Sequence, residues 1–190
     1  TPLHATRLHG ALIAQRRFED ANTLRDAQQL DVPRLPVIRG TAGPGLPVLR
    51  LDGQGHADRT GLPDSGWRIV ALVHPYCGYS RRALDAIATD DRFAPLQGRL
   101  QLVVPGGENW PESQITDWNT AHADLPPMQP MQPSARWDAL DPRQTPVFHL
   151  MRDGELVETT TGWTGSGEEL LRLAQRMQQA DNPLPADSRR

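Results

Sequence analysis

Apolar side chains recur at helical spacing near the N-terminus and then give way to short extended runs. Residues 3–30 carry apolar positions at this spacing, which predicts one amphipathic helix. Residues 32–66 contain two short apolar runs separated by glycine and proline, which favours extended segments or an irregular hairpin. The first part of the chain is therefore expected to form a helical and extended appendage.

Strands and helices alternate from Trp67 onward. Residues 67–73 are apolar except for Arg68, a pattern typical of a strand that is buried on both faces. The later predicted segments are a helix at 80–93, a strand at 100–105, a helix at 111–125, an extended proline-rich insert at 125–137, two strands joined at Asp153-Gly154, and a helix at 166–180. This order, β-α-β-α-β-β-α, predicts an α/β fold with one mixed sheet. The chain then divides into an appendage at 1–66, a domain at 67–181 and a flexible tail at 182–190.

Charge and composition exclude several classes of protein. The formal net charge is −3, and the 20 basic residues, all arginine, are dispersed, so no nucleic acid partner is expected. No apolar run approaches the ~18 residues of a membrane-spanning helix. The 6 histidines show no metal-ligand spacing with each other or with the single cysteine, so neither a metal nor a cofactor is expected.

The single cysteine, Cys77, stands where the first strand of the alternating region meets its first helix. It begins the motif CGYS at residues 77–80, and Thr145-Pro146 stands just before the predicted hairpin. These motifs, in this order, resemble the thioredoxin superfamily, in which a C-x-x-C pair and a cis-proline occupy the same places. The resemblance covers residues 67–180 and implies a thioredoxin-like fold.

Within that superfamily the motif resembles one group more than the others. The dipeptide Gly78-Tyr79 and the threonine before Pro146 are similar to those of bacterial periplasmic disulfide isomerases of the DsbC kind, whose active site reads CGYC. The buried aspartate that thioredoxins place six residues before the nucleophile is replaced by Ala71, which again favours a Dsb-like site. The resemblance implies thiol-disulfide exchange on protein substrates with disulfides, a membrane redox partner, and a periplasmic location after removal of a signal peptide.

The position of Cys77 also predicts its chemistry. A thiolate is the nucleophile in disulfide exchange, and the unpaired N–H groups at the first turn of a helix lower the pKa of a thiol placed there. His74, three residues earlier, favours the thiolate further when it is protonated. By the resemblance, Pro146 is cis and an extended substrate pairs with the Thr145 main chain. The expected substrate-binding residues are His74, Gly78, Tyr79, Thr145 and Pro146.

Ser80 stands at the resolving position, where a dithiol enzyme carries its second cysteine. A serine cannot form the internal disulfide, so a mixed disulfide at the catalytic Cys77 has no resolving partner within the chain. Three explanations remain open: an engineered Cys→Ser replacement, a natural monothiol site that isomerises or binds thiol adducts, and a relic in a protein that kept the fold for binding.

Other interpretations give the chain a different role. A redox-inactive, thioredoxin-fold binding component of an envelope conjugation or secretion assembly would explain the missing second cysteine, the appendage and the proline-rich insert. Monothiol glutaredoxins carry the similar motif CGFS, but the segment after Pro146 lacks their glycine-rich glutathione loop. The resemblance also implies a homodimer through the N-terminal helix, because the N-terminal regions of DsbC-like isomerases pair two chains.

Overall fold

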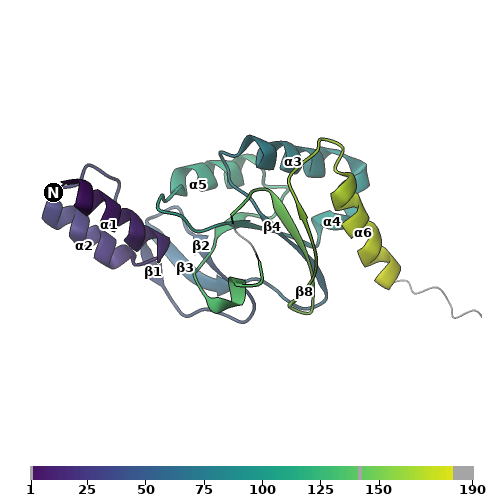
Figure 1. Ribbon diagram of the computed structural model, residues 1–190, viewed down its shortest axis with the longest axis horizontal. Helices are drawn as coiled ribbons and strands as arrows, with labels where there is room; N and C mark the ends of the chain where they lie inside the picture. The colour runs from purple at the N-terminus through teal and green to yellow at the C-terminus, as the bar shows by residue number, and fades with distance from the viewer. Residues whose placement is uncertain (1, 141–142, 182–190) are drawn as a thin grey trace, which may run out of the picture.

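The computed structural model describes residues 2–140 and 143–181, and Figure 1 shows how its helices and strands are arranged. The tail predicted at 182–190 lies outside the described residues. The N-terminal part contains α1 (Pro2–Ala14), α2 (Phe18–Gln28), β1 (Val37–Arg39), β2 (Pro47–Leu51) and β3 (His56–Gly61). The rest contains β4 (Trp67–Leu72), α3 (Gly78–Thr89), η1 (Asp91–Phe93), α4 (Ala94–Gln97), β5 (Leu100–Val104), α5 (Glu112–Ala121), β6 (Met128–Pro130), η2 (Ala135–Trp137), β7 (Val147–Arg152), β8 (Glu155–Thr161) and α6 (Glu168–Asp181).

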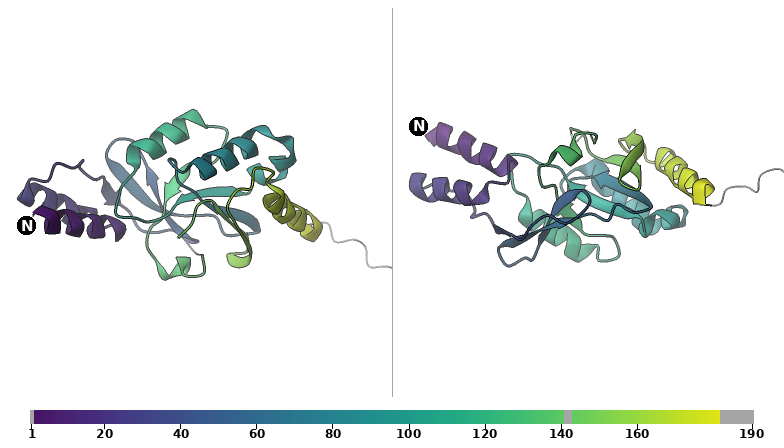
Figure 2. Two further views of the ribbon diagram at one scale, coloured as in Figure 1. Left: turned by 45° about the horizontal axis from the view of Figure 1, so that its top comes forward. Right: turned by 90° about the horizontal axis from the view of Figure 1, so that it is seen from below.

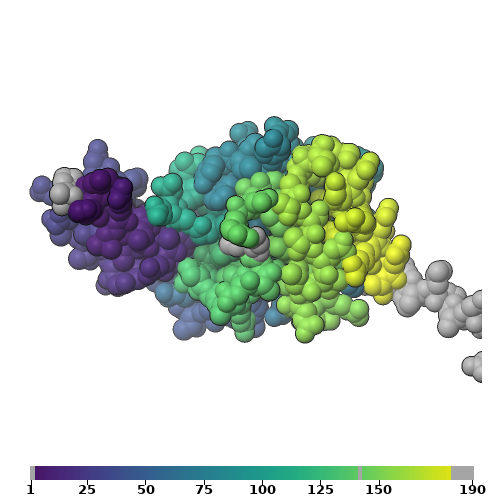
Figure 3. Space-filling model, in the orientation of Figure 1, coloured from purple at the N-terminus to yellow at the C-terminus, as the bar shows by residue number. Residues whose placement is uncertain are grey.

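The single helix predicted over residues 3–30 is wrong, because the chain reverses direction at residues 15–17 and forms two helices. Arg16 has a left-handed backbone with φ of 58°, which ends α1 without a glycine or proline. The reversal lets Phe18 and Ala21 of α2 pack against Leu12 and Ile13 of α1. Figures 1 and 3 show that this helical hairpin forms a lobe beside the main body of the protein.

Two sheets form within the described residues. The larger has five strands in the order β6-β5-β4-β7-β8, with β4 parallel to β5, β5 parallel to β6, and β7 antiparallel to both β4 and β8. The smaller has three strands in the order β1-β3-β2. The larger sheet and the helices between its strands confirm the predicted α/β, thioredoxin-like fold. Strand β6 was not predicted; it lies in the proline-rich insert, at a sheet edge where the N–H that Pro130 lacks is not needed.

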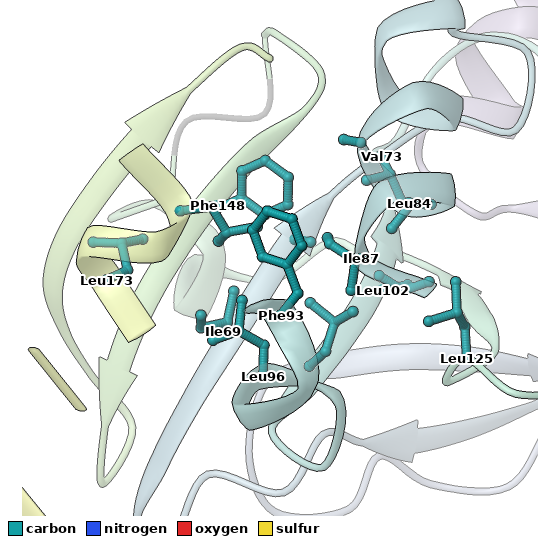
Figure 4. Close-up of a cluster of buried hydrophobic side chains, with 14 of the residues drawn as sticks. Ile69, Val73, Leu84, Ile87, Phe93, Leu96, Leu102, Leu125, Phe148 and Leu173 are labelled. Carbon is teal, nitrogen blue, oxygen red and sulfur yellow. The ribbon is translucent and has the colours of Figure 1, made fainter. Parts of the chain in front are cut away.

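Strand β4 is apolar except for the half-buried Arg68, because both faces of the larger sheet are covered. Ile69 and Ala71 face a core cluster formed with α3, η1, α4, α5 and α6, of which Figure 4 shows a part. Val70 and Leu72 face a second cluster on the other side. Helices thus cover one face of the sheet, and Figure 2 shows this arrangement from two further directions.

The second core cluster is built partly from the N-terminal part of the chain. Val48 of β2 and Leu62 contribute buried side chains to it, together with residues of the insert that follows β6. An isolated antiparallel bridge joins Val48 to Met131, and the Gln132 N–H donates to the Pro47 carbonyl at 3.0 Å. The division of the chain at residue 66 stays a prediction, but residues 46–62 share a core with the larger sheet.

Candidate functional site

The thiol of Cys77 lies at the N-terminal end of α3, directly after the β4–α3 connection. Cys77 is the residue that caps α3, and its carbonyl accepts a hydrogen bond from the Arg81 N–H at 3.0 Å. Its own N–H donates to the His74 carbonyl at 3.1 Å, which closes a tight turn before the helix. Ala83, Leu84 and Ile87 anchor the buried face of α3 on the sheet. The fold therefore holds the thiol at the positive end of a helix whose position is fixed.

Thr145 and Pro146 reach the thiol because β7 pairs with β4. The register places Leu72 opposite Val147, so the residues just before β7 lie beside those just after β4. The Thr145-Pro146 peptide bond is cis, as the resemblance implied. The Cys77 Sγ lies 3.5 Å from the Thr145 carbonyl oxygen, although the two residues are 68 positions apart. The structure thus brings Cys77, Thr145 and Pro146 together.

The pKa of the Cys77 thiol is lowered from its ordinary value. Partial burial by itself raises this pKa, but hydrogen bonds from the Ser80 N–H, the Thr145 side chain, the Ser80 hydroxyl and the Tyr79 N–H outweigh it. These donors stabilise the thiolate, whereas the Thr145 carbonyl accepts only from the protonated thiol. The thiol is also accessible, since Cys77 is partly exposed. A partly exposed cysteine with a lowered pKa has the properties of a reactive nucleophile.

Ser80 is part of the same hydrogen-bonded arrangement. Its side chain is fully buried, and its hydroxyl oxygen accepts from the His74 main-chain N–H at 3.3 Å. The same hydroxyl lowers the pKa of Cys77. The residue that stands at the resolving position therefore supports the thiolate, even though it has no sulfur to resolve a mixed disulfide.

The positive charge expected from His74 is not favoured. The imidazole is half-buried, and burial lowers the pKa of His74, which favours the neutral ring. Its Nδ1 atom has no hydrogen-bond partner among the described residues, and the ring stacks on Tyr76 with centroids 4.7 Å apart. His74 thus contributes a main-chain carbonyl and N–H to the site, and the support for the thiolate comes from hydrogen bonds instead.

Two exposed tyrosines flank the thiol. Tyr79 is 57% exposed beside the exposed Gly78, and the Arg82 guanidinium lies 4.7 Å from the centre of its ring. Tyr76 is 60% exposed on the other side of Cys77 in the sequence. Tyr76 was not among the predicted substrate-binding residues, although its place directly before the nucleophile is a signal that the sequence carries. Together the two rings offer apolar surface to a peptide near the thiol.

Among the described residues, no cluster of metal ligands accompanies the thiol. Within residues 2–140 and 143–181, no three His, Cys, Asp or Glu side chains gather as metal ligands would. In the same part of the chain no helix is long and apolar enough to cross a membrane. The expectation that the protein works without a cofactor remains a prediction.

Comparison with known proteins gives only distant similarities. No protein-family model matches the chain, and no curated protein sequence matches it. Solved structures that are similar include StoA from Bacillus subtilis (16% identity, 70% of this chain and 98% of that one, TM-score 0.44), an uncharacterized thioredoxin-like protein from Porphyromonas gingivalis (15%, 70% and 90%, 0.49) and a putative thioredoxin from Neisseria meningitidis (17%, 71% and 92%, 0.42).

Proposed function

We propose that this protein carries out thiol-disulfide exchange on protein substrates through Cys77. The observation that carries the proposal is the place of the thiol: it is partly exposed, its pKa is lowered, and its Sγ lies 3.5 Å from the Thr145 carbonyl beside the cis Pro146. An inert structural cysteine would instead be buried in apolar surroundings, which raise the pKa of a thiol.

The proposed reaction is an isomerisation with no net oxidation. The Cys77 thiolate attacks one sulfur of a substrate disulfide, which forms a Cys77–substrate disulfide and releases the other substrate sulfur as a thiolate. A second substrate thiolate then attacks the substrate sulfur of that mixed disulfide, which forms a new substrate disulfide and returns Cys77 as a thiolate. The main chain of Thr145 and the rings of Tyr76 and Tyr79 would contact the substrate on either side of its disulfide.

Ser80 limits this reaction to substrates that supply the second thiol. Its hydroxyl supports the thiolate but cannot attack a mixed disulfide, so adducts without a neighbouring substrate thiol are released slowly. Ser80→Cys would supply a resolving thiol within the chain. Such a variant should release adducts faster and gain the ability to reduce or oxidise substrates.

The test is the reactivation of ribonuclease whose disulfides have been scrambled. The wild-type protein should restore ribonuclease activity faster than the buffer does, and Cys77→Ser should not. Ser113→Ala, at an exposed position in α5, is a control that should match the wild type. If the wild type and Cys77→Ser give equal rates while both remain folded by circular dichroism, the exchange reaction is not the function.

The alternative is a binding component of an envelope assembly, and one observation favours it. Ser80 is fully buried and hydrogen-bonded to His74, so the site is well packed without a second thiol. Under this alternative, Cys77→Ala leaves the biological role intact. Loss of that role in cells that produce Cys77→Ala would argue against it.

Location and assembly belong to the same proposal. A periplasmic location and a membrane redox partner rest on the likeness of CGYS to CGYC, and cell fractionation tests the location.

A homodimer through the N-terminal segment is supported by Leu3 and Leu8 of α1, both more than half exposed. Sedimentation equilibrium at micromolar concentration tests the homodimer, which a monomeric mass would rule out.

A further inference from the structure

A cavity of about 650 Å³ lies between α2 and β1, and none of the residues around Cys77 lines it. The two elements are in contact, and Figure 1 shows them at the N-terminal end of the molecule. Pro36, Val37 and Ile38 form one wall, and residues of α2 form the other. The proposed thiol chemistry makes no use of this cavity.

The wall formed by β1 is the edge of the smaller sheet. On its outer side β1 therefore has main-chain N–H and C=O groups that pair with no strand among the described residues. Strand β1 runs parallel to β3, with Val37 opposite His56 and Arg39 opposite Asp58, and the Val37 N–H donates to the Gly55 carbonyl at 2.9 Å. In a parallel pair, alternate residues of an edge strand direct their N–H and C=O groups away from the partner strand. Those of Ile38 therefore point away from β3, and Ile38 lines the cavity.

The side chains that line the cavity leave positive charge uncompensated. Two arginines of the lining form ion pairs with carboxylates of the lining: Arg17 with Asp20 at 2.7 Å, and Arg34 with Asp26 at 3.1 Å. Within each pair the positive and negative charges cancel. Glu19 is the remaining carboxylate of the lining, and no arginine of the described residues pairs with it.

Arg16 and Arg59 have no carboxylate partner within the described part of the chain. Arg59 donates to the Gly40 carbonyl at 3.0 Å, and Arg16 donates to the carbonyls of Met131 at 3.0 Å and Ile13 at 3.1 Å. Arg16 is only 5% exposed, and burial lowers its pKa to about 10. Burying a cation without an anion costs free energy. An anionic ligand in this cavity, near Arg16, would reduce that cost.

We propose that this cavity, a groove between α2 and β1, binds an extended, acidic peptide segment of a partner protein as a strand added to β1. The peptide main chain would pair with the N–H and C=O of Ile38, as in other complexes in which a peptide extends a sheet. An acidic side chain of the peptide meets Arg59 and the charge of Arg16, and an apolar side chain contacts Val37, which is 59% exposed. The groove thus recognises a partner independently of the thiol.

The test is a titration of the isotope-labelled full chain with a capped pentapeptide, Val-Glu-Val-Glu-Val, followed by nuclear magnetic resonance. Saturable shifts are expected at the amides of residues 37–39, with the largest at the Ile38 N–H, and at Arg59. A peptide with glutamine in place of glutamate should bind about tenfold more weakly. A peptide methylated on alternate nitrogens, which cannot pair along β1, should not shift these amides.

Matched variants distinguish binding in the groove from a general attraction of the acidic peptide to positive charge on the protein. Arg59→Gln should weaken binding of the acidic peptide about tenfold, whereas Arg50→Gln, an exposed arginine of β2 outside the lining, should change it by less than about twofold. Cys77→Ser should bind as the wild type does, whether or not the thiol chemistry is correct. The proposal is overturned if residues 37–39 do not shift, if the methylated peptide binds equally well, if both arginine variants weaken binding alike, or if Cys77→Ser abolishes it.

Discussion

Replacing Ser80 with alanine removes one oxygen atom from the site and leaves the backbone in place. The side chain is fully buried, and alanine fills nearly the same volume. The variant keeps the Ser80 N–H as a donor to the sulfur, because that donor belongs to the main chain. It loses the hydroxyl that supports the thiolate and that accepts from the His74 N–H. The pKa of Cys77 should therefore rise.

The size of the effect follows from one hydrogen bond to a charged group. Such bonds contribute about 1.5–3 kcal/mol, and water replaces part of this one because Cys77 is partly exposed. A net loss of about 1 kcal/mol lowers the ratio of thiolate to thiol roughly fivefold. The less stabilised thiolate is intrinsically about twice as nucleophilic, because reactivity rises with pKa with a coefficient of about 0.4–0.5. Below the titration midpoint, the rate should fall only about two- to threefold.

The assay is the pH dependence of two signals, the ultraviolet absorbance of the thiolate and the rate of alkylation by iodoacetamide. In Ser80→Ala both midpoints should move to higher pH, and the plateau rate at high pH should exceed that of the wild type. Ser113→Ala should reproduce the wild-type curves. A midpoint that stays in place or moves to lower pH would refute the role given to the Ser80 hydroxyl. A lower rate at every pH would point to damage to the fold, which thermal unfolding would detect.

Two further predictions concern stability. Leu62→Ala should lower the free energy of unfolding, measured by urea titration, by about 2–3 kcal/mol, because Leu62 is buried in the second core cluster. Leu156 is 39% exposed, so Leu156→Ala should lower it by less than about 1 kcal/mol. Equal effects would contradict the shared core. Burial lowers the pKa of both His9 and His74 from 6.5, so the unfolded chain binds more protons and the free energy of unfolding should fall as pH drops below about 6.5. Replacing both histidines with glutamine should flatten this dependence, and an unchanged slope would contradict the assignment.

The site could be predicted from the sequence because the order of elements places its parts. Cys77 follows a strand that is apolar on both faces, and Thr145-Pro146 precedes a hairpin marked by Asp153-Gly154. Once the two strands pair, these segments must lie at the same end of the sheet. The order of elements and the resemblance to thioredoxins thus predicted the juxtaposition, whereas the β4–β7 register and the Sγ to Thr145 carbonyl distance of 3.5 Å come from the structure.

Other features depend on contacts that no local pattern carries. The turn at Arg16 contains neither glycine nor proline, and it is fixed by hydrogen bonds of the guanidinium to Ile13 and to Met131, 115 residues away. Strand β6 lies in a proline-rich stretch and forms because β5 offers an edge to pair with. The neutral form of His74 is favoured by burial, which the sequence alone does not reveal.

One measurement tests most directly whether the fold activates Cys77. The reduced protein is mixed with a disulfide-linked peptide at neutral pH, and the mixed disulfide at Cys77 is followed by intact mass, in buffer and in denaturing urea. We predict that the folded chain forms the adduct faster than the unfolded chain, and that a second thiol peptide releases it. A folded chain that reacts no faster than the unfolded one, or does not react, would contradict the account.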